Sequence, residues 1–304
     1  MTFQRHFLDL DDAQTPAIES LIARARQFKS GVAHATTRLR GKLVLGMFFE
    51  ASTRTATSFA AAAYRLGATW HDFGAATSSM SKGETPADTM HTVRAVGADA
   101  IVVRHWESGY PHALAPHFHG SILNAGDGSH AHPTQGVLDA MTLVEEFGTL
   151  AGRRLIICGD IRHSRVARSS ARAAWLLGAK VTLCAPPLLL PQTSPGWGFS
   201  ELSTVLDDCL PQADALMLLR VQTERGDGTE LPPFADLVEG YGLTEERLKL
   251  LPDHCIIMHP GPVNRDVEVA ASLIRVQRSR IDRQVENGVF VRMAVLERAL
   301  HHAA

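Results

Sequence analysis

The stretch KLVLGMFFEASTRTATSFAAAAYRLG, residues 42–67, decides the fold of its region of the chain. Its first part is a short, nearly continuous apolar run that ends at Glu50, which is typical of a strand buried in a parallel sheet. An alanine-rich segment follows and ends at Gly67, which is typical of a helix with a glycine C-cap. A strand that leads directly into a helix predicts an α/β fold.

The same alternation continues along the chain. Further runs that resemble buried strands are AIVVRH, SILNAG, RLIICGD, KVTLCAP, ALMLLR and CIIMHPGP. Between them lie segments that resemble helices ending at glycine, namely TPADTMHTVRAVG, TQGVLDAMTLVEEFG and SRVARSSARAAWLLG. This order predicts parallel sheets. Two stretches rich in proline, glycine or acidic residues, 185–200 and 223–242, are expected to be long loops, either functional lids or plain surface excursions.

The length of 304 residues predicts two domains. We place the boundary near residue 135, beside a helical segment that separates two series of strands. The first domain then covers 1–135 and the second 136–287. The final apolar helix, 288–304, follows an Asn-Gly break and is expected to pack back on the first domain.

The composition excludes several classes of protein. A formal net charge of −2 gives no basic field, so nucleic acid is not an expected partner. The four cysteines are widely spaced and form no C-x-x-C pair, which favours reduced thiols in the cytoplasm over disulfides or a zinc knuckle. No run approaches the roughly 18 apolar residues that span a bilayer. The acidic start does not resemble a secretory signal, so we expect neither export nor membrane association.

The turn between the first strand and its helix has the composition of an anion site. Ser52 stands at the expected N-cap, with Thr53, Arg54 and Thr55 in the first helical turn. Backbone N–H groups and the positive end of the helix favour an anion there, the hydroxyls add donors, and the arginine fork suits phosphate. An ordinary helix cap with an arginine pointing to solvent is the simpler interpretation of the same residues.

Together with six further motifs, this turn resembles the catalytic chain of aspartate carbamoyltransferase. The motifs are, in order, SSMSKGETPADT (78–89), VVRHWESG (102–109), NAGDGSHAHPTQGVLD (124–139), GDIRHSRVARS (159–169), LMLLRVQTER (216–225) and MHPGPVNRDVEV (258–269). Seven motifs at compatible spacings cover nearly the whole chain, so their combination is far more specific than any one of them.

The resemblance implies two Rossmann-like, three-layer α/β domains, one for carbamoyl phosphate and one for aspartate. It implies an enzyme of de novo pyrimidine biosynthesis that transfers the carbamoyl group of carbamoyl phosphate to the amino group of L-aspartate, giving N-carbamoyl-L-aspartate and phosphate. It implies no metal and no organic cofactor, and a homotrimer with shared active sites. Whether regulatory chains or a dihydroorotase join that trimer is left open by one catalytic sequence.

The family's functional residues carry over onto matching positions of this chain. The phosphate turn matches Ser52, Thr53, Arg54 and Thr55, and the surroundings of the carbamoyl group match Arg104, His132 and Gln135. The residues that hold aspartate match Arg165, Arg220 and Gln222, and the backbone at the reaction centre matches Gly261 and Pro262. Lys82 matches a loop residue that enters a neighbouring subunit's site, and Glu50 and Arg225 match partners of Arg165 in domain closure.

Two anionic substrates explain this density of cations. Two unit charges about 4 Å apart repel by about 4 kcal/mol in a partly screened site, which the cationic side chains offset. Without a ligand, the cationic side chains of such a cluster repel one another. We therefore expect a site that is open when empty and closes when both substrates are bound. The candidate catalytic residues are Arg54, Thr55, Arg104 and His132, the last three as donors to the carbonyl oxygen as it becomes negative. The departing phosphate can accept the proton of the amine.

Two alternative functions stay open. An ornithine carbamoyltransferase shares the phosphate turn and the H-P-x-Q motif, but MHPGPVNR stands here where that family shows a cysteine-containing HCLP. The other is a catalytically idle scaffold in an assembly of pyrimidine enzymes. It is kept because Ala56 stands where the family commonly has a second arginine, although alanine is also a good helix former.

Metal and dinucleotide sites are not expected. His130 and His132 with Asp127 nearby, and the pair His117 and His119, lack the helical or thiolate context of a zinc site. The segment ICGDIRHSR lacks the G-x-G-x-x-G pattern of a dinucleotide fold.

Overall fold

A four-stranded parallel sheet forms the centre of the first part of the chain. The computed structural model describes residues 5–31, 37–74, 85–191, 197–221 and 233–301. Strand β1 (Leu43–Phe48) lies between β2 (Thr69–Asp72) and β3 (Ala100–His105), and β4 (Ser121–Asp127) lies beyond β3. All three pairings are parallel. The apolar run that opens the chain's first βα unit is thus a central strand, buried along Val44–Met47.

A five-stranded parallel sheet forms the centre of the second part. Its order is β7 (Glu201–Ser203), β6 (Lys180–Cys184), β5 (Arg154–Cys158), β8 (Ala215–Leu218) and β9 (Ile256–Met258). Here too every pairing is parallel. The alternation of apolar runs and helical segments in the sequence therefore leads to the predicted parallel sheets.

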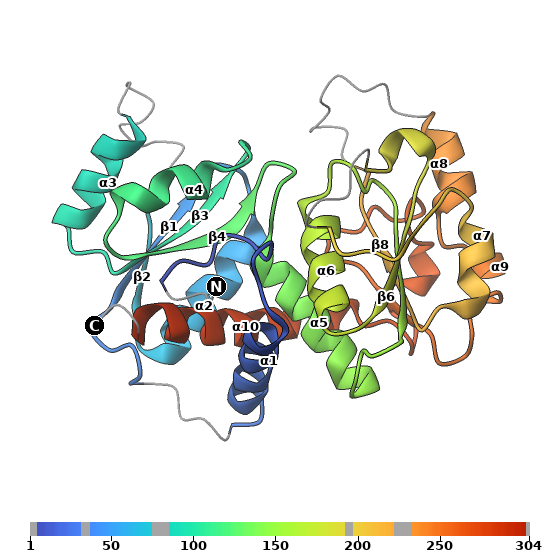
Figure 1. Cartoon of the computed structure of the whole chain (residues 1–304), viewed down its shortest axis with the longest axis horizontal. Coiled ribbons are helices and arrows are strands. Elements are labelled where there is room, and N and C mark those ends of the chain that lie inside the picture. The colour runs from blue at the N-terminus through green and yellow to red at the C-terminus, as the bar shows by residue number, and fades with distance from the viewer. Residues whose placement is uncertain (1–4, 32–36, 75–84, 192–196, 222–232, 302–304) are drawn as a thin grey trace. The chain divides into compact units, whose positions relative to one another are not determined.

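Helices cover both faces of each sheet (Figure 1). Those of the first part are α1 (Thr15–Lys29), α2 (Thr53–Leu66), α3 (Pro86–Ala95) and α4 (Tyr110–Leu114). Those of the second part are α6 (Arg165–Leu176), α7 (Leu206–Cys209), α8 (Phe234–Tyr241) and α9 (Glu245–Leu248). Short 3-10 turns occupy Ala115–His117, Pro187–Leu189, Leu210–Gln212 and Ala271–Leu273. Within the described part of the chain, no helix has both the length and the apolar character needed to cross a membrane.

Contacts divide the chain into two compact units. The first comprises Met1–Leu138 and Glu286–Ala304, and the second comprises Asp139–Val285. The chain passes from one unit to the other inside two helices, α5 (Pro133–Phe147) and α10 (Ile281–His301). Two three-layer α/β domains with parallel sheets are confirmed as the fold. Which substrate each domain binds stays a prediction at this point.

The C-terminal helix packs on the first unit, as predicted. Arg24 of α1 donates two hydrogen bonds to the carboxylate of Glu297 in α10, at 2.6 and 2.7 Å. Ser121 Oγ, at the start of β4, donates to the carbonyl oxygen of Ala299 at 2.9 Å. Burial of the Glu297 carboxylate would raise its pKa, but the hydrogen bonds from Arg24 and the charges of Arg24 and Arg38 outweigh it, so the pKa lies below its ordinary value.

The Asn-Gly dipeptide does not break this helix, and that expectation is wrong. Helix α10 starts at Ile281 and continues through Asn287 and Gly288. Asn287 is fully buried and accepts a hydrogen bond from Lys29 Nζ at 2.6 Å. A Cβ on Gly288 would lie 2.5 Å from a guanidinium nitrogen of Arg292 and 3.3 Å from Leu138 Cδ2. Both residues therefore serve close packing rather than a turn.

Other differences from the sequence analysis are small. The region 223–242 is not a loop throughout, because α8 occupies Phe234–Tyr241 and buries Leu237. Its apolar residues recur at helical spacing, a signal hidden by the prolines and glycines around them. The sequence analysis also misses β2 and β7, which are short edge strands with mostly exposed residues, and the helices α1, α4, α7 and α9.

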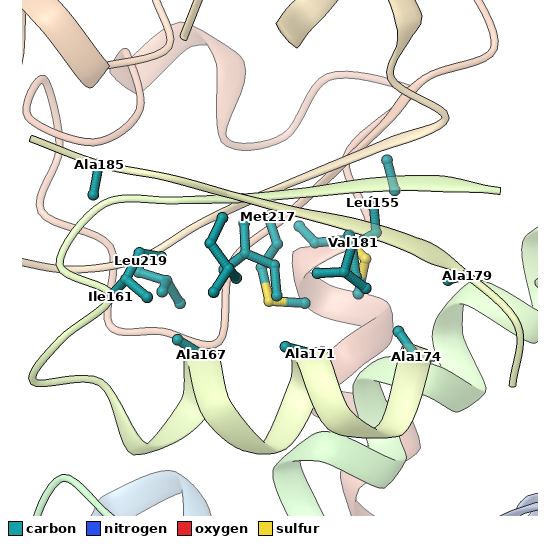
Figure 2. Close-up of a cluster of buried hydrophobic side chains, with 14 of the residues drawn as sticks. Leu155, Ile161, Ala167, Ala171, Ala174, Ala179, Val181, Ala185, Met217 and Leu219 are labelled. Carbon is teal, nitrogen blue, oxygen red and sulfur yellow. The ribbon is translucent and has the colours of Figure 1, made fainter. Parts of the chain in front are cut away.

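A row of alanines brings α6 close to the second sheet. Ala167, Ala171 and Ala174 recur every three or four residues and are completely buried. Figure 2 shows them facing side chains of the sheet, among them Val181 and Met217. Because these three positions contribute only methyl groups, the larger strand side chains fill the layer between them.

We predict that Ala171→Leu lowers the free energy of unfolding by about 1 to 3 kcal/mol, because three extra carbon atoms must enter a filled layer. Urea denaturation of the two proteins measures the difference. Ala235→Leu on α8 is the matched control, since Ala235 is exposed and should tolerate the same change. Equal effects at both positions would contradict the packing described for α6.

Candidate active site

The carboxyl ends of the strands gather the candidate residues within each unit. In the first sheet the chain moves from β1 to β2 on one side and later to β3 on the other, so strand order reverses between β1 and β3. In the second sheet the same reversal lies between β5 and β8. Open parallel sheets bind ligands beside the carboxyl ends of their strands at such switch points. Four of the arginines singled out from the sequence lie at or just after the ends of these four strands.

The turn after β1 has the form that the sequence predicts. Helix α2 starts at Thr53, with Ser52 at the N-cap position. The Ser52 side chain makes no capping hydrogen bond to the helix, so its hydroxyl is not used to complete the described structure. Thr55 is 6% exposed, whereas Thr53 and Arg54 are exposed. Ala56 donates its backbone N–H to the Ser52 carbonyl oxygen at 3.2 Å and starts the helical hydrogen-bond pattern.

The first turn of α2 has an unusual charge for a helix. It contains Arg54 and no acidic residue, although the positive end of the helix dipole favours acids and opposes cations. Helix α6 in the second unit has the same feature: Arg165 is its first residue, and its first turn has no acid. The dipole of each helix therefore opposes its arginine. A bound anion would interact favourably with both the cation and the helix end.

At the end of β3, Arg104 pairs with an acidic residue of the neighbouring strand segment. Its Nε lies 3.2 Å from Glu50 Oε2, and the two side chains are 15% and 18% exposed. The guanidinium also donates to the Ala125 carbonyl oxygen at 3.4 Å. This places Arg104 over the carboxyl edge of β1, β3 and β4. The closure role expected for Glu50 is untested, and in this structure Glu50 lies beside Arg104.

The loop after β4 brings two more candidates to the same edge. His132 is 4% exposed and directly precedes α5, which starts at Pro133. Its carbonyl oxygen accepts hydrogen bonds from the backbone of Gln135 at 2.9 Å and of Gly136 at 3.1 Å. Gln135, in the first turn of the helix, is 8% exposed. Proline at the first helical position fixes where α5 begins, and therefore where His132 stands.

A buried carboxylate holds this loop in place. Asp127 is completely buried and accepts hydrogen bonds from the Asn124 side chain at 2.7 Å and from the backbone of Gly109 at 2.7 Å and Ala131 at 3.1 Å. Burial would raise the pKa of Asp127, but the hydrogen bonds from His130 and Asn124 outweigh burial and lower it. The ionised carboxylate ties β4 to the loops on both sides of it.

His105, next to Arg104, is a core histidine rather than a titrating site residue. Its ring stacks on Tyr110 with centroids 3.7 Å apart, and its Nδ1 accepts a hydrogen bond from the backbone of Glu107 at 2.9 Å. Burial lowers the pKa of His105. The neutral ring helps to fix the end of β3.

In the second unit, the loop after β5 leads to Arg165. Ser164 caps α6, since its side chain accepts a hydrogen bond from the backbone of Ala167 at 3.1 Å. Arg165 is only 2% exposed. In the same loop, His163 Nδ1 lies 2.9 Å from Asp160 Oδ1, and both side chains are buried. These polar contacts help to hold the start of α6.

A second buried carboxylate joins the loops after β8 and β9. Glu268 is 5% exposed and accepts hydrogen bonds from the backbone of Val221 at 3.3 Å and of Asn264 at 2.9 Å, and from the Asn264 side chain at 3.0 Å. Val221 directly follows Arg220. Glu268 therefore links the Arg220 segment to the loop that contains Gly261 and Pro262.

Two further hydrogen bonds hold the start of the loop after β9. The backbone of His259 donates to Gln284 Oε1 at 2.9 Å, and the backbone of Gly261 donates to His259 Nδ1 at 2.9 Å. Gly261 has a φ of +71°, a conformation that favours glycine, and is joined to Pro262 by a cis peptide bond.

Three of the candidates lie outside the described residues. They are Lys82, Gln222 and Arg225. The other twelve candidates lie at or after the carboxyl ends of strands, eight in the first unit (Glu50, Ser52, Thr53, Arg54, Thr55, Arg104, His132 and Gln135) and four in the second (Arg165, Arg220, Gly261 and Pro262).

Sequence reasoning overlooked the residues that support the loops. Asn124, Asp127, Glu268 and Gln284 make the hydrogen bonds described above, and Asp139 adds another set by accepting from Ser170 and Gln284 at 2.5 and 2.8 Å. The available signal was a polar residue at or just after a buried strand, as in NAGD. It does not reveal a partner that is distant in the sequence.

Comparison with known proteins agrees with the geometry of both units. Residues 5–145 match the family model of the aspartate/ornithine carbamoyltransferase carbamoyl-P binding domain, and residues 151–299 match that of the Asp/Orn binding domain. The aspartate carbamoyltransferase catalytic subunit of Acidothermus cellulolyticus is 53% identical over 258 residues, which are 85% of this chain and 80% of that protein.

Solved structures give the same result. Aspartate transcarbamoylase from Trypanosoma cruzi in complex with N-(phosphonacetyl)-L-aspartic acid superposes with a TM-score of 0.88 at 30% identity, covering 98% of this chain and 96% of that one. Ornithine carbamoyltransferase from Thermus thermophilus reaches 0.86 at 26% identity, with 97% and 98% covered. The fold alone does not separate the two activities, but the 53% identity does. The chain therefore belongs to the aspartate/ornithine carbamoyltransferase family, on its aspartate carbamoyltransferase branch.

Proposed function

We propose that the protein transfers the carbamoyl group of carbamoyl phosphate to the amino group of L-aspartate, giving N-carbamoyl-L-aspartate and phosphate, in pyrimidine biosynthesis. The observation that carries this proposal is the arginine in the first turn of α2 and of α6, where each helix end also lacks an acid. Each helix begins at the switch point of its own sheet. Two such anion sites suit a reaction between two anionic substrates.

The first unit supplies the residues for carbamoyl phosphate. We assign the phosphate to Ser52, Thr53, Arg54 and Thr55, because hydroxyls, helix N–H groups and an arginine fork all donate hydrogen bonds to phosphate. We assign the carbamoyl group to Arg104, at the end of β3, and to His132 and Gln135, which follow the neighbouring strand β4. None of these roles needs a metal or an organic cofactor.

The second unit supplies the residues for aspartate. Arg165 and Arg220 follow β5 and β8, on the two sides of that sheet's switch point, and pair with the substrate carboxylates in our assignment. Gln222 assists them, and the backbone at Gly261 and Pro262 borders the reacting group. Glu50 and Arg225 are assigned to domain closure.

The chemical step is an acyl transfer. The neutral α-amine of aspartate attacks the carbonyl carbon, a C–N bond forms, and the bond from that carbon to the phosphate oxygen breaks. Thr55, Arg104 and His132 stabilise the carbonyl oxygen as it becomes negative; one such donor typically contributes about 3 to 4 kcal/mol. The leaving phosphate takes the proton that the amine loses, so the step needs no protein base.

We also propose that the protein works as a homotrimer in the cytoplasm. The four cysteines are unbridged thiols, which suits a reducing compartment. Lys82 is assigned to the active site of a neighbouring subunit, so each site would need two chains. This assembly predicts a solution mass near three times 33.0 kDa.

An assay for carbamoylated amino acid, run with aspartate and with ornithine, tests the activity. We expect product with aspartate and carbamoyl phosphate, and none with ornithine. Product with ornithine alone would identify an ornithine carbamoyltransferase instead. No product with either substrate would favour an idle scaffold, since this chain has Ala56 where the family commonly has an arginine.

Arg54→Ala should lower turnover at least about 100-fold, because it removes a charge-assisted contact to the leaving phosphate. Arg65→Ala is the matched control, since Arg65 is an exposed arginine in the last turn of the same helix and should keep near-normal turnover. Near-normal turnover in Arg54→Ala would refute the assignment of the phosphate turn.

Mixed trimers test the shared site. Arg54→Ala and Lys82→Ala proteins are each expected to be nearly inactive. When the two are dissociated, mixed in equal amounts and reassembled, about a quarter of the sites should combine an intact Arg54 with an intact Lys82 from the neighbour, so about a quarter of the activity should return. Activity no higher than that of the two parents would show that each chain builds its own site.

A further inference from the structure

Two histidines and an aspartate meet at one place in the first unit. One ligand atom each from His112, Asp127 and His130 lie within 4.8 Å of one another. His112 belongs to α4, Asp127 ends β4, and His130 lies in the turn that follows. Two imidazoles and a carboxylate are a donor set typical of divalent transition metals such as Zn²⁺ and Co²⁺.

The carboxylate of this group is held in a fixed orientation. Asp127 is completely buried and accepts hydrogen bonds from Asn124 and from the backbone of Gly109 and Ala131. Its Oδ2 also lies 3.0 Å from His130 Nδ1. Metal sites depend on such outer hydrogen bonds, because these orient the ligand before the metal arrives.

A carboxylate also orients His112. His112 Nε2 lies 2.6 Å from Asp9 Oδ2, and His112 Nδ1 is buried with no hydrogen-bond partner among the described residues. The rings of His112 and His130 meet edge to face, with centroids 5.4 Å apart. A histidine that gives one ring nitrogen to a carboxylate and leaves the other unbonded has the arrangement of a metal ligand with its supporting carboxylate.

We propose that His112, Asp127 and His130 bind a divalent metal ion of the zinc class, with water completing its coordination and Asp9 supporting His112. Metal bonds of about 2.1 Å in a tetrahedron place ligand atoms about 3.4 Å apart, a separation within the 4.8 Å limit found here. Mg²⁺ and Ca²⁺, which prefer oxygen ligands, do not suit the two imidazoles. The ion joins α4 to the loop that carries His132, and its role is to brace that loop rather than to take part in carbamoyl transfer.

The fold selects a different histidine pair from the one visible in the sequence. His130 and His132 form an H-x-H pair, which the sequence analysis set aside as a metal site. The partner of His130 in space is His112, 18 positions earlier in the chain. Asp9 and Asp11, from the segment before α1, form a second group with His130 within the same 4.8 Å limit. They add negative charge around the proposed ion.

Without a metal, the same groups form two ion pairs. The hydrogen bond that the His112 ring donates to the Asp9 carboxylate raises the pKa of His112, and Asp127 pairs with His130. This is the competing explanation for the cluster. It predicts no stoichiometric binding of metal, because protons and hydrogen bonds then satisfy every charge.

Calorimetric titration of untagged, chelator-treated protein with Co²⁺ distinguishes the two explanations, with the visible absorption of bound Co²⁺ as a second readout. We expect one ion per chain. His112→Asn and His130→Asn should each weaken binding by more than about 100-fold, and Asp9→Asn by about 10- to 100-fold. His117→Asn and His119→Asn, the same change at two exposed histidines, are the matched controls and should bind as the unaltered protein does.

Circular dichroism of each variant shows whether it is folded, and a folded variant that binds Co²⁺ with unchanged affinity overturns the proposal. Absence of stoichiometric binding by the unaltered protein overturns it as well and leaves the ion pairs. The titration uses no substrate, so its outcome is independent of the proposed carbamoyl transfer.

Discussion

Parallel pairing of strands is the constraint on which the rest of this structure depends. It places the carboxyl ends of all strands of a sheet at one edge. At that edge, the strand order reverses between β1 and β3 in the first sheet and between β5 and β8 in the second, so the loops that leave these two strands diverge. Each described candidate residue lies at or just after such an end. The sheet thereby collects, within each unit, side chains that are far apart in the sequence, and the helix that follows each strand presents its N-terminus to the same edge.

Buried carboxylates hold these edges in place. Asp127 and Glu268 are almost completely buried, and each accepts several hydrogen bonds from loops that leave different strands. An ionised group is costly to bury unless its oxygens are bonded, so each carboxylate favours one arrangement of its loops. The site arginines then project from backbone that is already fixed, which reduces what a substrate must order on binding.

The charge at two helix ends departs from what local stability favours. Arg54 and Arg165 stand in first turns that would favour acids, and no acid accompanies them. Departures from local rules of this kind are expected at functional sites. Such departures can be read from the sequence once the helix start is known, which is why the sequence predicts an anion site in the turn after β1. The ion pair of Glu50 with Arg104 could not be predicted from the sequence, because the two residues belong to different strand segments.

The sequence by itself determined the central strands, the helices that follow them and the parallel arrangement, since continuous apolar runs and helical spacing are local signals of burial. Only the tertiary structure decided the edge strands β2 and β7, which are short and exposed and bury too little to leave such a signal. It also decided that Asn287 and Gly288 continue α10, because Lys29, Leu138 and Arg292 surround them, and that His130 meets His112 rather than its neighbour in sequence. Contacts between distant segments set these outcomes, and no local pattern encodes them.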